Sequence, residues 1–211
     1  MLHCENVVGT PMHKSARPVL VVLLMLLAGG LSGCEQSVAL GPGIRAAAAP
    51  LQWPTDPSPF PHRGFVLSPQ AEFTITAKLL SRRQYRWDSL ADLAPWDFAV
   101  GWDLMSDETL LEWVSITQGD RFLFRQLLHP RLPLRRIEQS SANLHLIPAD
   151  PATEAKLASV DLGAIITLSG LLVNARDDPR GREFLTSLSR DDVGAGACEI
   201  LYVRELEVKA P

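Results

Sequence analysis

The feature of this sequence that most constrains its fold is a pair of β-rich segments. Between Phe73 and Leu80 apolar side chains alternate with threonine and lysine, the period of two that is typical of a half-buried strand. Ala164 to Ala175 is a second β-rich run, broken at Gly170, where a strand often bulges or bends sharply. Small barrels turn their corners with long strands bent at a glycine. These segments predict a domain built mainly from strands.

The other segments predict further strands and one or two short helices. Asp150 and Pro151 form the N-cap and first turn of a helix of about eight residues. Ser106, ahead of two acidic residues, indicates another helix start, although 114–117 fits a strand equally well. Residues 87–102 show no clear period and predict a packed loop with at most one helical turn. Further strands are expected at 121–128, 140–147, 183–188 and 199–208.

The fold predicted from this tally is mostly β. We expect a compact barrel of the OB or SH3-like kind with one or two short helices, and a two-layer α+β sheet is the alternative. Of the three cysteines only Cys198 lies in the predicted folded body, which excludes an internal disulfide and a cysteine-based zinc cluster there. The domain must therefore rely on its hydrophobic core.

The N-terminal region has the pattern of an export signal. Lys14 and Arg17 precede an unbroken apolar run, Val19 to Ala28, and small residues follow it. Ten residues rise only about 15 Å as a helix, roughly half of a ~30 Å hydrocarbon core. The run is thus too short for a good permanent span. Met12 makes a more conventional signal start than Met1, so translation starting at Met12 is an alternative.

Leu31-Ser32-Gly33-Cys34 resembles the lipobox of bacterial lipoproteins. The resemblance implies cleavage before Cys34 and acylation, including palmitate, on that cysteine. Such an anchor would hold the protein on a membrane without a transmembrane helix. In that family aspartate after the cysteine tends to retain the protein in the inner membrane. Glu35 stands there, so the resemblance favours the periplasmic face of the outer membrane.

The domain boundaries follow from composition. Residues 1–33 are the predicted lipoprotein signal peptide, 34–62 a tether rich in proline and alanine, and 63–211 a single mostly-β periplasmic domain. Trp53 and Phe60 are the exceptions in the tether, where docking on the domain and simple exposure are the two alternatives.

Charge argues against nucleic acid as a partner. The chain has a formal net charge of -4, whereas a nucleic-acid footprint needs a concentrated basic face. The nearest approach is residues 82–87, where arginines interleave with Tyr85 and Trp87, and a solvated strand face explains that pattern more simply.

Cys198 is the candidate nucleophile. It follows a flexible stretch of glycine and alanine, with His145 as a possible base and Asn143, Asp191 or Asp192 as its possible orienter. The alternative is that Cys198 is a small buried residue of the last strand and His145 a strand residue. No metal site is predicted, because the three histidines after Cys34 lack a ligand spacing, and no cofactor is expected.

Two polar segments, 140–145 and 187–191, flank predicted core strands. They predict either a polar binding cleft, with Asn143, His145 and Arg190 as candidate binding residues, or ordinary turn chemistry. The segment 140–203 is similar to uncharacterised bacterial membrane-associated proteins that share a Ser-Ala-Asn-x-His and a Cys-Glu-hydrophobic pattern, which implies no activity.

The predicted function is a binding or assembly module of the cell envelope, anchored to the membrane through Cys34, with an envelope protein as a possible partner. The alternative is a Cys/His-dependent hydrolase or transferase acting on envelope material.

Overall fold

The computed structural model describes residues 37–56, 58–130, 132–189 and 198–209 of the chain, and these residues form a mostly-β domain, which confirms the predicted class. The strands are β1 (Leu51–Trp53), β2 (Phe60–His62), β3 (Phe65–Gln84), β4 (Trp96–Gly101), β5 (Val114–Gly119), β6 (Phe122–Leu127), β7 (Ser141–Pro148), β8 (Ile165–Asp177), β9 (Arg182–Phe184) and β10 (Glu199–Val208). The helices are α1 (Glu108–Leu111), α2 (Leu134–Gln139) and α3 (Pro151–Ser159), with 3-10 turns η1 (Asp103–Ser106) and η2 (Asp178–Arg180).

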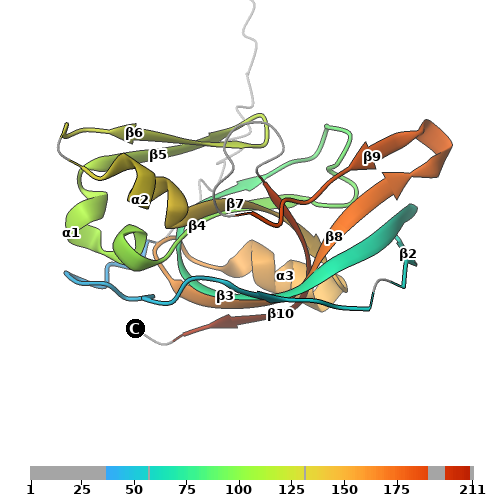
Figure 1. Cartoon of the computed structure of the whole chain (residues 1–211), viewed down its shortest axis with the longest axis horizontal. Helices are drawn as coiled ribbons and strands as arrows, with labels where there is room; N and C mark the ends of the chain where they lie inside the picture. The colour runs from blue at the N-terminus through green and yellow to red at the C-terminus, as the bar shows by residue number, and fades with distance from the viewer. Residues whose placement is uncertain (1–36, 57, 131, 190–197, 210–211) are drawn as a thin grey trace, which may run out of the picture. The chain divides into compact units, whose positions relative to one another are not determined.

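Five strands of the main sheet pair in an order that returns to its starting strand (Figure 1). β3 pairs with β4, β4 with β7, β10 with β8 and β8 with β3, all antiparallel, whereas β7 and β10 are parallel. The length of β3, 20 residues, makes this possible, because its stretch 66–78 pairs with β8 and its stretch 78–84 with β4.

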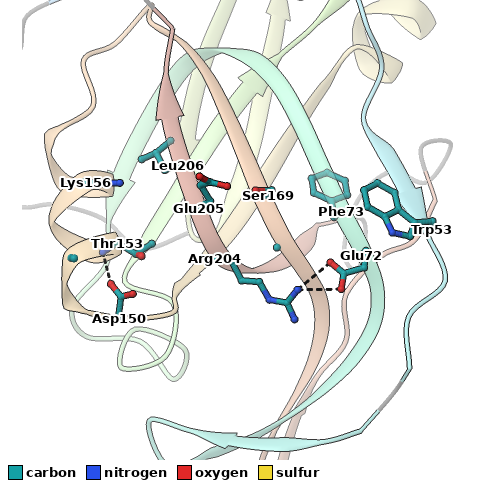
Figure 2. Close-up of a pocket in the computed structure, with 12 residues that line it drawn as sticks. Trp53, Glu72, Phe73, Asp150, Thr153, Lys156, Ser169, Arg204, Glu205 and Leu206 are labelled. Atoms are coloured by element: carbon teal, nitrogen blue, oxygen red, sulfur yellow. Dashed lines mark hydrogen bonds and ion pairs between the residues drawn. The ribbon is translucent and has the colours of Figure 1, made fainter.

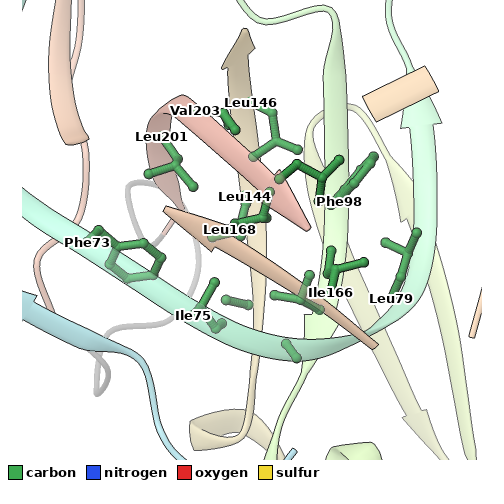
Figure 3. Close-up of a cluster of buried hydrophobic side chains, with 14 of the residues drawn as sticks. Phe73, Ile75, Leu79, Phe98, Leu144, Leu146, Ile166, Leu168, Leu201 and Val203 are labelled. Atoms are coloured by element: carbon green, nitrogen blue, oxygen red, sulfur yellow. The ribbon is translucent and has the colours of Figure 1, made fainter. Parts of the chain in front are cut away.

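The main hydrophobic core lies on the inner side of these five strands. Alternate side chains point inward, as the period of two requires, and Figure 3 shows them converging from all five strands. Full burial of each large aliphatic side chain is worth about 1.5–3 kcal/mol. The residues labelled there are Phe73, Ile75, Leu79, Phe98, Leu144, Leu146, Ile166, Leu168, Leu201 and Val203.

Gly170 lies where β8 is enclosed on both sides. It is paired with Phe73 of β3 and with Val203 of β10, and the β10 register shifts between Val203 and Glu205. A Cβ atom on Gly170 would lie 1.9 Å from the carbonyl oxygen of Tyr202. The irregularity that the sequence predicted here therefore accompanies a backbone approach that only glycine allows.

The helix predicted after Asp150 is present as α3. The Asp150 carboxylate accepts a 2.7 Å hydrogen bond from the Thr153 N–H, and Pro151 occupies the first turn. Leu157 is fully buried and contributes to the main core. The helix thus connects β7 to β8 while covering part of the core.

β4 was expected to be a loop, and the structure corrects this. All six residues of Trp96–Gly101 are buried, so the strand shows no alternation of apolar and polar residues. Its inner face carries Trp96 and Phe98, while Asp97 lies on the other face. The predicted helical turn near Leu90 does occur in the connection before β4.

The segment that the sequence predicts to be a tether is paired with the domain over much of its described length. β1 and β2 both add antiparallel to β3. The Val38 N–H donates to the Leu162 carbonyl at 2.7 Å, and Ala46 is buried in the main core. The Glu108 carboxylate accepts hydrogen bonds from the N–H groups of residues 40 and 41. These hydrogen bonds satisfy backbone N–H groups of residues that lie outside the named strands.

Among the residues described, no helix has both the length and the apolar character needed to cross a bilayer.

Candidate functional site

A polar cluster lies on the face of β4 and β7 that points away from the main core. Asp97 of β4 is paired directly with His145 of β7, and Asn143 lies two residues from His145 on the same face. The intervening Leu144 points into the core. The β5–β6 hairpin contributes Gln118 to this face, and its Nε2 donates to the Asn143 side-chain oxygen at 2.7 Å.

Asp97 is the centre of the cluster. Its side chain is 0% exposed, and Oδ1 lies 2.6 Å from Nη1 of Arg121. The same oxygen lies 2.9 Å from Nδ1 of His145, an ion-pair distance without the alignment of a hydrogen bond. Asn143 Nδ2 donates to Oδ2 at 3.4 Å. A buried carboxylate of this kind is stable only because cationic and amide groups surround it.

Arg121 is placed by the tight turn of the β5–β6 hairpin. Asp120 and Arg121 have φ angles of 50° and 69°, the positive values that a type I′ turn requires at both central positions. Such a backbone is strained for residues other than glycine, asparagine and aspartate, and strain of this sort persists when surrounding contacts fix it.

Contacts at both ends of Arg121 fix it. Its guanidinium forms two 2.9 Å hydrogen bonds to Asp88, donates to the Ala94 carbonyl and lies 3.9 Å from the centroid of the Tyr85 ring. Its main-chain N–H donates to the Tyr85 hydroxyl at 3.1 Å. Its carbonyl oxygen accepts from Asn143 Nδ2 at 2.9 Å.

Cys198 completes the cluster from the residue before β10. Its Sγ lies 3.8 Å from the Arg121 carbonyl oxygen and 4.0 Å from Asn143 Nδ2. The parallel pairing of β10 with β7 brings the cysteine to this position, because Glu199 is paired with Leu144. Cys198 is partly exposed and its thiol is not in a disulfide.

The environment of His145 favours its charged form. Burial by itself lowers the pKa of this imidazole, but the neighbouring Asp97 carboxylate and the Cys198 side chain raise it, to about 9 overall. At neutral pH His145 is therefore a cation, held between a buried carboxylate and a thiol. The two side chains that the sequence singled out as base and nucleophile are thus near enough for Cys198 to raise the pKa of the imidazole.

Cys198 and His145 both line a cavity of about 370 Å³. One side of the cavity comes from the β3–β4 connection and the other from β9 and the residues around it. Most of its remaining lining is apolar: Leu90, Phe122, Phe184, Leu185 and Ile200. An apolar cavity with a few convergent polar groups is the usual form of a small-molecule site.

The structure brings together three of the predicted site residues, Cys198, His145 and Asn143. Arg190 and Asp191 lie outside the described residues, as does Cys34. The carboxylate that contacts His145 is Asp97, which the sequence analysis did not identify. An aspartate inside the apolar stretch Trp96–Gly101 was the signal that could have found it.

A second cavity, of about 470 Å³, lies over β8, β10 and α3 (Figure 2). Three of its charged side chains already have partners within the protein, since Arg204 pairs with Glu72 at 3.1 Å and Asp150 caps α3. Trp53 of β1 lies at its edge. The described part of the chain holds no group of three or more histidine, cysteine or acidic side chains arranged to bind a metal ion.

Comparison with known proteins gives no relative. No family model matches the chain, and no curated protein sequence or solved structure matches it significantly.

Proposed function

We propose that the protein is a lipid-anchored envelope enzyme that uses Cys198 as a nucleophile, with His145 and Asp97 as its partners, to hydrolyse or transfer acyl groups of envelope material. One observation carries the proposal: Cys198 and His145, whose interaction raises the pKa of the imidazole, line the same cavity, and Asp97 lies behind the imidazole. A thiol, an imidazole and an orienting acid are the parts that Cys/His catalysis requires.

The chemistry follows from these positions. The Cys198 sulfur, as thiolate, attacks the carbonyl carbon of an ester, thioester or amide, and the imidazolium of His145 gives its proton to the leaving group as the bond to that group breaks. Water or an acceptor amine then attacks the acyl thioester and releases Cys198, while neutral His145 takes up the proton. Asp97 positions the imidazole and stabilises its charged form. The apolar cavity supplies space for the acyl group.

The fold that we infer for this site is an OB-type barrel. Around the circuit the five strands are the first, second, third, fifth and fourth in chain order, an exchange that is typical of a Greek key. The barrel assignment is supported by the return of the pairing to β3.

Thiol reactivity tests the catalytic part of the proposal. At pH 7 we expect iodoacetamide to alkylate Cys198 about ten times more slowly in a His145→Gln variant than in the native protein, because a neighbouring imidazole activates a cysteine nucleophile. The rate is measured by mass spectrometry of the peptide that contains Cys198, so that the other cysteines do not interfere.

The matched control is His129→Gln, which removes an exposed histidine on the loop after β6 and should leave the rate unchanged. A native protein treated with p-nitrophenyl acetate should also carry an acetyl group on Cys198. Equal alkylation rates in the two histidine variants, with no acetyl adduct, would rule out the thiol chemistry.

The proposed location depends on Cys34, and membrane fractionation tests it. We propose attachment to the periplasmic face of the outer membrane through acyl chains on Cys34, since two or more chains make a stable anchor. A Cys34→Ala variant is then expected in the soluble fraction, whereas Cys198→Ala should stay with the membranes. A Cys34→Ala protein that still pellets with membranes contradicts the anchor.

A binding or assembly module remains the second candidate, and one observation favours it. The outer face of the β5–β6 hairpin and its flanks exposes four large apolar side chains: Trp113, Phe122, Phe124 and Leu128. Exposed apolar groups of this kind mark surfaces that contact other molecules. If binding is the function, a Cys198→Ala variant should still complement a strain that lacks the protein, whereas a Phe124→Ser variant should not. If the protein is an enzyme, the Cys198→Ala variant should fail to complement.

A further inference from the structure

We infer that a further cavity, beside the Cys198 site and formed by Arg83, Tyr85, Arg86 and Trp87, binds an oxyanion group of the substrate, a phosphate or a carboxylate attached next to a flat ring. The inference rests on the proposed function for its link to Cys198. The binding itself can be measured independently of that chemistry.

This cavity has a volume of about 540 Å³ and touches the Cys198 cavity. Asp88 and Arg121 line both, so the ion pair between these residues forms their common wall. A ligand lying across this wall can place one group beside the Cys198 thiol and another among the arginines.

Two guanidinium groups in this cavity remain available for an anion. Arg83 donates to the Gln118 carbonyl oxygen at 2.7 Å, and Arg86 donates to the Gln84 side-chain oxygen at 2.8 Å. Both acceptors are neutral, and within the described residues neither arginine forms an ion pair with a carboxylate. Arginine binds phosphate and carboxylate through paired, charge-assisted hydrogen bonds, so these two groups fit an oxyanion.

Trp87 indicates which chemical group the ligand carries beside its oxyanion. Its side chain is 95% exposed, although an indole is normally buried to a large extent. An indole next to two arginines offers a flat surface on which a ring can stack. The ligand we infer therefore carries a ring or sugar face beside its oxyanion.

The acidic residues around the cavity limit the size of the anion. Asp88 is neutralised by Arg121, but Asp120 also lines the cavity, and its negative charge repels an anion that the two arginines attract. With a net charge of -4 on the chain, a long polyanion such as a nucleic acid is disfavoured. A single phosphate or carboxylate group meets less of this repulsion than a polyanion does.

Calorimetry with phenyl phosphate as the probe tests the inference in the full-length protein. We expect Arg83→Gln and Arg86→Gln each to weaken binding about tenfold or more. Asp120→Asn should strengthen binding severalfold, and asparagine tolerates the positive φ at that position. Arg176→Gln, an exposed arginine that pairs with Asp178, is the matched control and should bind like the native protein.

Further probes distinguish a free ligand from a lipid headgroup as the source of the oxyanion. They also test this inference separately from the proposed catalysis. Inorganic phosphate should bind more weakly than phenyl phosphate, and Trp87→Ala should abolish that difference. Binding to phosphatidylglycerol vesicles but not phosphatidylcholine vesicles, lost with Arg83→Gln, would identify a lipid headgroup as the source. If phenyl phosphate still binds the Cys198→Ala variant while native Cys198 forms no acyl adduct, the oxyanion site stands and the proposed thiol catalysis is wrong. Binding that is the same in the Arg83, Arg86 and Arg176 variants overturns the oxyanion site.

Discussion

Replacing Asp97 with asparagine is expected to lower the free energy of unfolding by about 3–5 kcal/mol at pH 6. The substitution keeps the shape of the side chain but leaves Arg121 and the charged His145 without their buried counter-charge, which is the costly way to break a buried ion pair. Urea unfolding followed by fluorescence measures the change. Asp88→Asn is the matched control, because Asp88 pairs with the same arginine but is 35% exposed, and its loss should cost about 1 kcal/mol or less.

The pH dependence of stability provides a second readout for Asp97→Asn. Burial lowers the pKa of His145, but the Asp97 carboxylate and the Cys198 side chain raise it, so that it is about 9 in the folded protein against 6.5 for a free imidazole. A histidine with a raised folded pKa adds stability that is complete below pH 6.5 and is lost as the pH rises through about 9. The native protein should therefore lose about 3 kcal/mol between pH 6 and pH 10 from this group. An Asp97→Asn variant that kept the native pH profile would show that this carboxylate does not hold the imidazole charged.

Gly170→Ala is expected to destabilise the domain by about 3 kcal/mol, at the upper end of the cost of overpacking. The new methyl group would lie 1.9 Å from the Tyr202 carbonyl oxygen, and backbone rather than a mobile side chain must move to admit it. β8 cannot shift away, because β3 pairs with it on the other side. Thermal or urea unfolding measures the loss.

The chain offers a matched glycine for comparison. Gly119 has no positive φ, and a Cβ atom there meets only a ring carbon of Phe124 at 3.9 Å. Gly119→Ala should therefore change stability by less than about 1 kcal/mol. Equal effects at the two positions would mean that the close approach at Gly170 is not what fixes the strand pair.

Sequence reasoning found several of the strands, including β7, all of whose residues are buried. β3 shows the alternation plainly, and the capping residues Asp150 and Pro151 predict α3. β4 escaped because its outer face is covered by the β5–β6 hairpin and the preceding connection, so Asp97 and Ala99 are as buried as Phe98. Burial on both faces removes the periodic signal on which such predictions depend.

The candidate site was predictable in part. Cys198 and His145 could be proposed as partners from residue type and flanking sequence. An aspartate within an apolar stretch marks Asp97 as unusual, but its pairing with His145 could not be predicted, since this is a cross-strand contact between segments about fifty residues apart. The place of Arg121 in the site was not predicted for another reason. It depends on two consecutive residues with positive φ, and the pair Asp120-Arg121 is not the usual sequence of such a turn.

The pairing of Ser37 with the domain would limit how far a lipid anchor on Cys34 lets the domain move from a membrane. Ser37 forms a bridge to Leu162, and only three Cα–Cα steps, about 11 Å of fully extended chain, separate Ser37 from Cys34. If Cys34 carries acyl chains, this short connection keeps the domain within reach of the lipid headgroups. If the proposed chemistry at Cys198 holds as well, we expect its substrates to be molecules that reside in that bilayer or diffuse along its surface.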